Sequence, residues 1–180
     1  MYLNGTPSDR LYDPEFEKSN CGVGVLMDLN GRRTHELVED GFTLLENLDH
    51  RGARGAEEKT GDGAGMLIQK PHEFFKSEIP ELPDADEYAV GMLFMPRDPE
   101  AREGVRGLVE EGLKDEGFEL IAWRDVATNN SDLGATALKN EPVVQQIFVR
   151  LASEEAVEPS VLDARLYMLR RVLENKVAFS

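Results

Sequence analysis

The hydrophobic pattern of this sequence switches several times between a strand-like and a helix-like period. Short apolar runs predict strands at 21–27, 66–69, 88–95, 118–126 and 143–150. Apolar residues at helical spacing predict helices at about 34–49, 100–116 and 160–176, with a helical turn at 72–76. Thr34 is the expected N-cap of the first helix. Because strands and helices interleave along the chain, the fold belongs to the mixed α+β or α/β classes.

The charge balance of the chain excludes several classes of partner. The 180 residues fit one domain, and their net charge of −15 argues against nucleic acids and anionic membrane surfaces, which are bound through clustered Lys and Arg. No apolar run approaches the roughly 20 residues of a membrane-spanning helix. Two explanations of the charge stay open. One is an acidic surface that keeps the protein soluble. The other is adaptation to high salt, which the 13 Arg against 7 Lys also fit.

The first 20 residues have the composition of a polar leader. They are interrupted by Pro7 and Pro14, carry Asp9 and Asp13, and contain no apolar stretch. This composition excludes a secretory signal peptide, so a cytoplasmic location is the default expectation. The predicted organisation is therefore a leader at 1–20 followed by one domain at 21–180.

Cys21 opens the apolar run that follows this leader, and it is the only cysteine of the chain. A single cysteine excludes an intramolecular disulfide, a four-cysteine zinc site and an iron–sulfur cluster held by this chain alone. The histidines, His35, His50 and His72, have no metal-ligand spacing, so no metal site is predicted. The plain interpretation of a lone cysteine is a small buried hydrophobic residue.

A catalytic interpretation of Cys21 rests on its place between the leader and the apolar run. Gly22 and Gly24 would let a substrate or a backbone segment approach closely. Cleavage between Asn20 and Cys21 would create a free α-amino group, whose pKa of about 7.7–8.0 suits a general base near neutral pH. One residue would then carry both the nucleophilic thiol and the base, as N-terminal nucleophiles do.

Several short motifs resemble those of one enzyme family and occur in the same order. They are Leu11-Tyr-Asp-Pro14, Cys21-Gly-Val-Gly24, His50-Arg-Gly-Ala53, Thr60-Gly-Asp-Gly-Ala-Gly65, Gln69-Lys-Pro-His-Glu-Phe-Phe75 and Trp123-Arg-Asp-Val126. Together they make the chain similar to the amino-terminal class II glutamine amidotransferase domain of glutamate synthase large subunits. In this resemblance 1–20 is the leader or propeptide, and 21–180 is the amino-terminal part of the domain.

The resemblance implies a fold and a chemistry. The fold is the four-layer α/β/β/α arrangement of N-terminal nucleophile hydrolases, in the α+β class and incomplete in this chain. The chemistry is hydrolysis of the glutamine side-chain amide through a cysteinyl thioester, which delivers ammonia for glutamate synthesis from 2-oxoglutarate. No cofactor is implied in this chain, whereas FMN and an iron–sulfur cluster are expected in the full-length enzyme. The implied partners are L-glutamine, the remainder of the glutamate synthase chain, and a small subunit or ferredoxin.

The same resemblance gives roles to individual residues. Cys21 is the nucleophile, and its α-amine is the base after processing. Arg51 of the His-Arg-Gly motif has a supporting role, and a guanidinium beside the thiol would favour the thiolate. The loop residues expected near the site are Gly22, Gly52, Gly61, Asp62 and Gly63. The substrate-binding residues and the family's oxyanion-hole Asn-Gly pair are expected downstream of Ser180, so the 180 residues alone are expected to be inactive.

Plainer roles and other functions stay open. Arg51 would form only a surface ion pair with Asp49 or Glu46 in the plain interpretation, and His50 a structural hydrogen bond. The chain could be a non-catalytic fragment or split-gene module that docks on a partner. It could also be another class II amidotransferase or N-terminal nucleophile hydrolase. The residues do not distinguish ferredoxin from NAD(P)H as the electron donor, nor do they define the oligomeric state.

Overall fold

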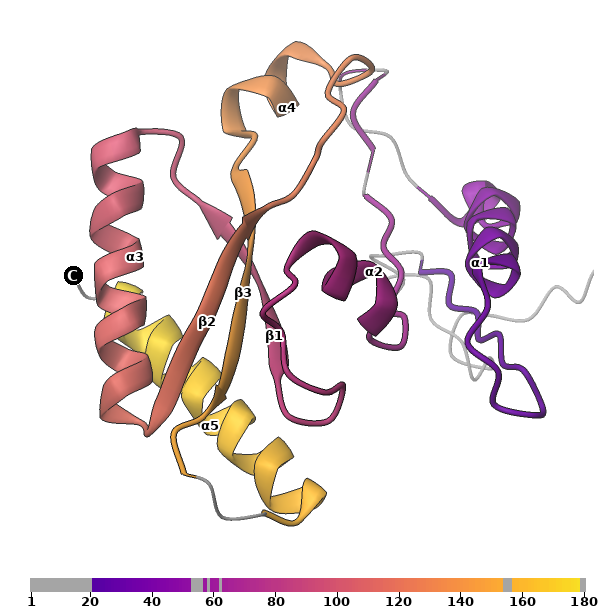
Figure 1. Cartoon of the computed structure of the whole chain (residues 1–180). Coiled ribbons are helices and arrows are strands. Elements are labelled where there is room, and N and C mark those ends of the chain that lie inside the picture. Colours follow the sequence, from indigo (N-terminus) through magenta and orange to yellow (C-terminus); the bar gives the residue numbers. More distant parts are fainter. Residues whose placement is uncertain (1–20, 53–56, 58, 62, 154–156, 179–180) are drawn as a thin grey trace, which may run out of the picture. The chain divides into compact units, whose positions relative to one another are not determined.

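A computed structural model describes residues 21–52, 57, 59–61, 63–153 and 157–178 (Figure 1). The chain divides into two compact units, Met1–Gln69 and Lys70–Ser180. The predicted leader at 1–20 and the predicted loop residue Asp62 lie outside the described residues. Among the helices that the structure describes, none is both long enough and apolar enough to cross a membrane.

The second unit contains an antiparallel sheet of three strands, β1 (Ala89–Met95), β2 (Phe118–Asp125) and β3 (Val143–Leu151). Their order is β1-β3-β2, so the last strand in the sequence lies in the middle (Figure 1). Ile147 of β3 stands opposite Gly91 of β1 and Trp123 of β2. All three strands were expected from their apolar runs, and each end lies within one residue of its predicted position.

Helices α3 (Pro99–Asp115) and α5 (Pro159–Ala178) cover one face of this sheet (Figure 1). Asp98 caps α3 by accepting a hydrogen bond of 2.8 Å from the Ala101 amide, and Pro99 occupies the first turn, where its missing N–H is no loss. Both helices were predicted from their helical spacing. The buried core beneath them comprises Val109, Leu113, Phe118, Ile147, Val149 and Leu169.

The opposite face of the sheet carries the short helix α2 (His72–Glu78) and the segment that follows it. Because side chains alternate along a strand, Phe148 points to this face while its neighbours Ile147 and Val149 point to the other. The ring of Phe75 meets that of Phe148 edge-on, with centroids 5.0 Å apart. The remaining buried members of this second cluster are Ile79, Leu82 and Tyr88.

The first unit contains α1 (His35–Asn47) and a single 3₁₀ turn, η3 (Asp49–Arg51). Thr34 Oγ1 accepts a hydrogen bond of 3.3 Å from the Leu37 amide, which confirms the predicted N-cap. The strands predicted at 21–27 and 66–69 are wrong, since both segments lack regular secondary structure. Val23 is 86% exposed and Leu67 99%. An apolar run becomes a strand only where a neighbour completes a hydrogen-bonded ladder, and neither segment has one among the described residues.

One further helix, α4 (Ala135–Asn140), had no counterpart in the sequence prediction. It is six residues long and has no buried residue, so it carries no apolar face from which a period could be recognised. The chain is thus a mixture of helices and an antiparallel sheet, and the predicted mixed class is confirmed at that level.

Candidate active site

Cys21 begins a segment of irregular structure that extends to residue 28 in the first unit. Its side chain is exposed, and so is Gly22. Gly24, three residues further on, packs directly against Leu44 of α1. The exposed thiol does not fit the plain interpretation of Cys21 as a buried hydrophobic residue. A substrate or a thiol reagent can reach it.

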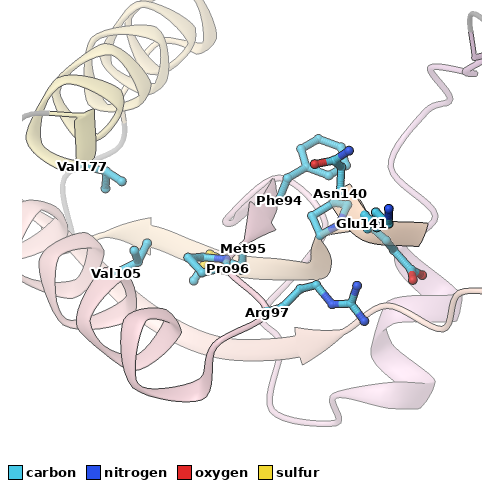
Figure 2. Close-up of a pocket in the computed structure, with 10 residues that line it drawn as sticks. Phe94, Met95, Pro96, Arg97, Val105, Asn140, Glu141 and Val177 are labelled. Carbon is cyan, nitrogen blue, oxygen red and sulfur yellow. The ribbon is translucent and has the colours of Figure 1, made fainter. Parts of the chain in front are cut away.

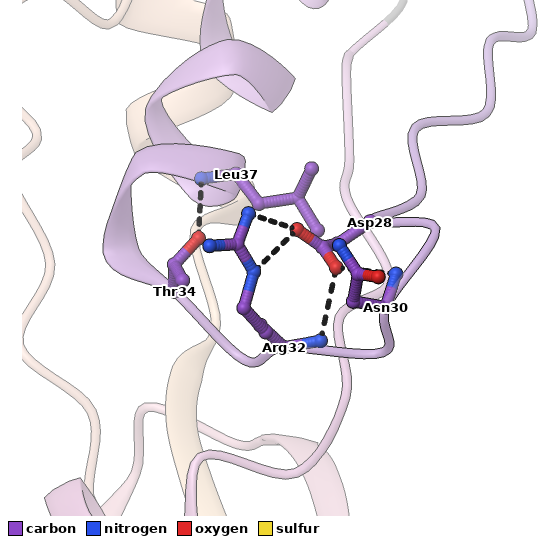
Figure 3. A network of polar contacts seen from close by, with 5 residues as sticks. All are labelled: Asp28, Asn30, Arg32, Thr34 and Leu37. Atoms are coloured by element: carbon purple, nitrogen blue, oxygen red, sulfur yellow. Dashed lines mark hydrogen bonds and ion pairs between the residues drawn. The ribbon is translucent and has the colours of Figure 1, made fainter.

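A tight turn connects the Cys21 segment to α1 (Figure 3). The Asp28 carboxylate accepts hydrogen bonds from the backbone amides of Asn30 at 2.7 Å and Arg32 at 3.2 Å. It also accepts two from the Arg32 guanidinium, at 3.0 Å from Nε and 2.8 Å from Nη2. Gly31 has a φ of 69°, which glycine adopts without strain. The sequence indicated the turn through Asn30-Gly31 but not the roles of Asp28 and Arg32, which an aspartate two residues before that pair could have suggested.

This network also has an electrostatic consequence at Asp28. The hydrogen bond from the Arg32 side chain is the main cause that holds the pKa of the Asp28 carboxyl below its ordinary value, and the amides of Arg32 and Asn30 add to it. Asp28 therefore stays ionised at neutral pH, and the guanidinium of Arg32 balances its charge within the turn.

The predicted supporting residue Arg51 lies directly after α1. Leu48 is both the C-cap of α1 and the N-cap of η3, so the two elements are continuous. His50 Nδ1 donates to the Asn47 carbonyl at 2.9 Å, a local contact of the structural kind expected for this histidine. The Gly52 amide donates to the Asp49 carbonyl at 3.0 Å and closes the turn. The side chain of Arg51 lies outside the described structure, so its predicted contact with the thiol stays a prediction.

The glycine-rich loop contributes a third segment to the first unit. Thr60 donates a side-chain hydrogen bond of 2.7 Å to the Glu57 carboxylate, and its amide donates to the Glu57 carbonyl at 2.9 Å. Gly61 and Gly63 are exposed, and Gly63 has a φ of 87°, which favours glycine. Three residues later, Met66 packs against the buried Gly41 of α1.

The described segments that carry the predicted site residues therefore all belong to the first unit and all adjoin α1. The Cys21 segment meets it at Leu44, η3 continues from its end, and the segment after the glycine-rich loop meets it at Gly41. Within the described part of the chain, no group of three or more His, Cys, Asp and Glu side chains could hold a metal ion.

A cavity of about 430 Å³ lies elsewhere, in the second unit (Figure 2). Its walls come from the end of β1 and the residues after it, from α3, from the end of α4 and the connection that follows, and from the end of α5. Phe94, Arg97, Val105, Asn140 and Val177 are among the lining residues. None of the predicted site residues contributes to it, and the cavity contains no cysteine or histidine. The cavity therefore does not coincide with the site predicted from the sequence.

Comparison with known proteins defines the class of the chain. Residues 21–180 match the family described as "Glutamine amidotransferases class-II", and the match begins at Cys21. The chain therefore belongs to the class-II glutamine amidotransferases.

The chain is also similar to named enzymes of this family. It is 37% identical over 97% of its length to the "Glutamate synthase [NADPH] large chain" of Bacillus subtilis. It is 37% identical over 90% to the "Ferredoxin-dependent glutamate synthase 2" of Synechocystis, and 37% identical over 89% to the "Glutamate synthase [NADH]" of Schizosaccharomyces pombe. The chain spans only 12%, 10% and 8% of the lengths of these relatives. The names of these relatives give three different electron donors at the same sequence identity, so the similarity does not identify the electron donor that goes with this chain.

Proposed function

We propose that this chain supplies the nucleophile for the glutaminase step of a larger glutamate synthase. That step hydrolyses the side-chain amide of L-glutamine and delivers the ammonia for glutamate synthesis from 2-oxoglutarate. One observation carries the proposal: the family match begins at the only cysteine of the chain, and that thiol is exposed. The names of the relatives favour a glutamate synthase over other class-II amidotransferases and over a non-catalytic module.

The proposed reaction proceeds in two steps through the thiol. The Cys21 thiolate attacks the carbon of the glutamine side-chain amide, and the carbonyl oxygen becomes an oxyanion. Collapse of this intermediate forms a thioester and expels the amide nitrogen, which takes up a proton and leaves as ammonia. Water then attacks the thioester carbon, so glutamate leaves and the thiol is regenerated. A covalent intermediate of this kind divides one difficult hydrolysis into two easier steps.

The proposed base is the α-amino group of Cys21, which becomes free when residues 1–20 are removed. With a pKa of about 7.7–8.0, this amine is partly neutral near pH 7.5 and can take the thiol proton. It can then return the proton to the departing nitrogen. The polar composition of 1–20 and the start of the family match at residue 21 support this assignment. Residues 21–180 would then be the amino-terminal part of the amidotransferase domain.

Arg51 is the proposed supporting residue, because a guanidinium beside the thiol stabilises the thiolate. Its place in η3, directly after the helix that contacts Gly24, supports a location near Cys21. Gly22, Gly52, Gly61 and Gly63 are exposed, as loop residues that border a substrate would be, and we assign the same role to Asp62.

The wider enzyme is part of the same proposal. The partner would be the remainder of a glutamate synthase in the cytoplasm, with a small subunit or ferredoxin as the source of electrons. FMN and an iron–sulfur cluster would be bound outside this chain, because a cluster needs several thiolates and the chain has one cysteine. In the proposed four-layer fold, the sheet covered by α3 and α5 would be one of the two central layers.

The proposal is tested by Cys21→Ala and Cys21→Ser in the full-length protein. Glutamine-dependent glutamate formation should fall by at least about 10³-fold, because the nucleophile is lost. Ammonia-dependent formation should remain, since it bypasses the thioester, and it serves as the control. Intact-mass analysis after treatment with 6-diazo-5-oxo-L-norleucine should show one adduct on a chain that begins at Cys21. Full glutamine turnover by Cys21→Ala, or an active chain that begins at Met1, would contradict the respective assignment.

A further inference from the structure

The Cys21 segment approaches α1 at a point where no side chain fits. A Cβ atom built on Gly24 would lie 2.3 Å from Leu44 Cδ2 and 2.9 Å from both Cδ1 and Cγ. Rotation about the last bond of Leu44 would not relieve this overlap, because Cγ itself is too close. The described glycines with positive φ are Gly31, Gly63 and Gly117, so Gly24 has no such conformational reason to be glycine. The requirement at this position is steric.

A second close approach lies on the same helix. Gly41 is buried in the interior of α1, where glycine is a poorer helix former than alanine. A Cβ atom built there would lie 2.4 Å from Met66 Sδ, while the next nearest atom of Met66 is 3.7 Å away. Only one atom of a flexible side chain would have to move, so this contact is more tolerant than the one at Gly24.

The helix therefore determines where three predicted parts of the site lie. The N-terminal end of α1 is connected to the Cys21 segment by the Asp28 turn, and its C-terminal end leads into η3 and Arg51. Two contacts along the helix, Leu44 with Gly24 and Gly41 with Met66, hold the two neighbouring segments. Each connection is short, so a displacement at any of them is transmitted to the residues beside it.

We propose that Gly24 is a positioning residue for the Cys21 thiol: its contact with Leu44 sets the distance of the nucleophile-bearing segment from α1. The inference rests on the proposed function, in which Cys21 is the nucleophile. Ordinary contact begins at 3.4 Å and the nearest Leu44 atom is 2.3 Å away, so a methyl group at residue 24 requires a shift of about 1 Å, shared between the Leu44 side chain and the Cys21 segment. A misplacement of that size at a reacting group can lower a rate by about 10²-fold.

The test compares Gly24→Ala with the double variant Gly24→Ala/Leu44→Ala in the full-length protein. The Leu44 substitution removes Cγ and both Cδ atoms, so it restores room for the new methyl group. Gly107→Ala is the matched control, because a Cβ there meets nothing within 4 Å on the surface of α3 in the other unit. Gly41→Ala provides a graded comparison at the more tolerant contact.

The readout is the reaction of Cys21 with 6-diazo-5-oxo-L-norleucine at saturating concentration, measured as a rate constant per reactive site and as the final extent of labelling. Gly24→Ala should lower the rate constant by about 10- to 100-fold with the extent unchanged, and Leu44→Ala in the double variant should restore most of it. Gly107→Ala should match the wild type, and Gly41→Ala should fall between. A purely structural role would lower the extent of labelling and leave the rate constant alone.

Two results separate this inference from the function on which it rests. If Cys21→Ala abolishes glutamine turnover but Gly24→Ala labels at the wild-type rate, the positioning role is wrong and the function stands. The positioning role is also wrong if Gly24→Ala is slow and the double variant is equally slow, because the contact with Leu44 would then not be the cause. If Cys21→Ala keeps glutamine turnover, the function itself is wrong.

Discussion

The carboxylate of Asp28 accepts four hydrogen bonds within one turn, two of them from a single guanidinium. Ionised Asp28 is stabilised in the folded chain, chiefly by the Arg32 side chain, so its pKa lies below the ordinary value of 3.8. A carboxyl whose folded pKa is lowered contributes stability that is complete above its unfolded pKa. That contribution is lost as the pH falls through the lower folded pKa. The turn beside Cys21 should therefore remain intact at neutral pH and loosen only below about pH 4.

An NMR titration of the Asp28 carboxyl checks this expectation. In the wild-type chain the midpoint should lie below 3.8, and Arg32→Gln should raise it, because the largest cause of the lowered pKa is removed. Arg33→Gln is the matched control: it removes the same charge one residue away and leaves the hydrogen bonds of Asp28 in place. An Asp28 midpoint that is identical in the wild type and in Arg32→Gln would show that the guanidinium does not hold the turn.

At the scale of elements, α2 depends on one aromatic residue of the central strand. Phe148 is fully buried in β3, and its ring contacts Phe75 edge-on and lies 6.1 Å from that of Tyr88. Phe148→Ala should lower the free energy of unfolding by about 3–5 kcal/mol, because it removes buried surface and leaves a cavity. Phe94→Ala makes the same change on β1 at a side chain that is 73% exposed, and it should stay within about 0.5 kcal/mol.

Denaturant unfolding of the two variants and of Phe148→Leu measures these differences. The leucine variant keeps most of the volume and should fall between the other two, so the comparison survives if the alanine variant does not fold. Equal stability of Phe148→Ala and Phe94→Ala would mean that the second cluster contributes little to the fold of this unit.

The hydrophobic period predicted elements correctly where the chain also supplies their partners. Each of β1, β2 and β3 has a neighbour among the described residues, and α3 and α5 have the sheet beneath them. The runs at 21–27 and 66–69 are also apolar, but they have no ladder partner among the described residues, and a single strand is not a stable element. An apolar run indicates that a segment favours burial, but it does not show whether a neighbouring strand is present to pair with it.

The candidate site, too, could be predicted from the sequence only in part. Sequence alone could single out Cys21, because it is the only cysteine and follows a change in composition. The roles of Arg51 and Asp62 came from the family resemblance, since nothing in their spacing distinguishes a catalytic residue from a surface charge. The contacts at Gly24 and Gly41 were not predictable, because a sequence does not tell which surfaces of a helix another segment will approach.

At the scale of the whole molecule, the charge balance predicts a dependence on salt. The chain has 35 acidic and 20 basic residues, so the compact state holds repelling carboxylates close together. Exposed ion pairs such as Arg150–Glu119 oppose this repulsion, but each contributes only about 0–1 kcal/mol and salt weakens them too. The excess of 15 negative charges should therefore decide the sign of the change in stability with salt, so that added salt stabilises the fold.

The melting temperature of the chain should rise as KCl increases from 0.01 M to 1 M. The Debye length falls from about 30 Å to about 10 Å by 0.1 M and to about 3 Å at 1 M, so repulsion between charges on different elements is mostly screened in the first part of the range. Screening therefore predicts a steep rise at low salt that flattens above a few tenths molar. A rise proportional to concentration up to 1 M would instead indicate exclusion of the salt from the protein surface. A melting temperature that does not change would contradict both net repulsion and adaptation to high salt, and the acidic residues would then serve solubility alone.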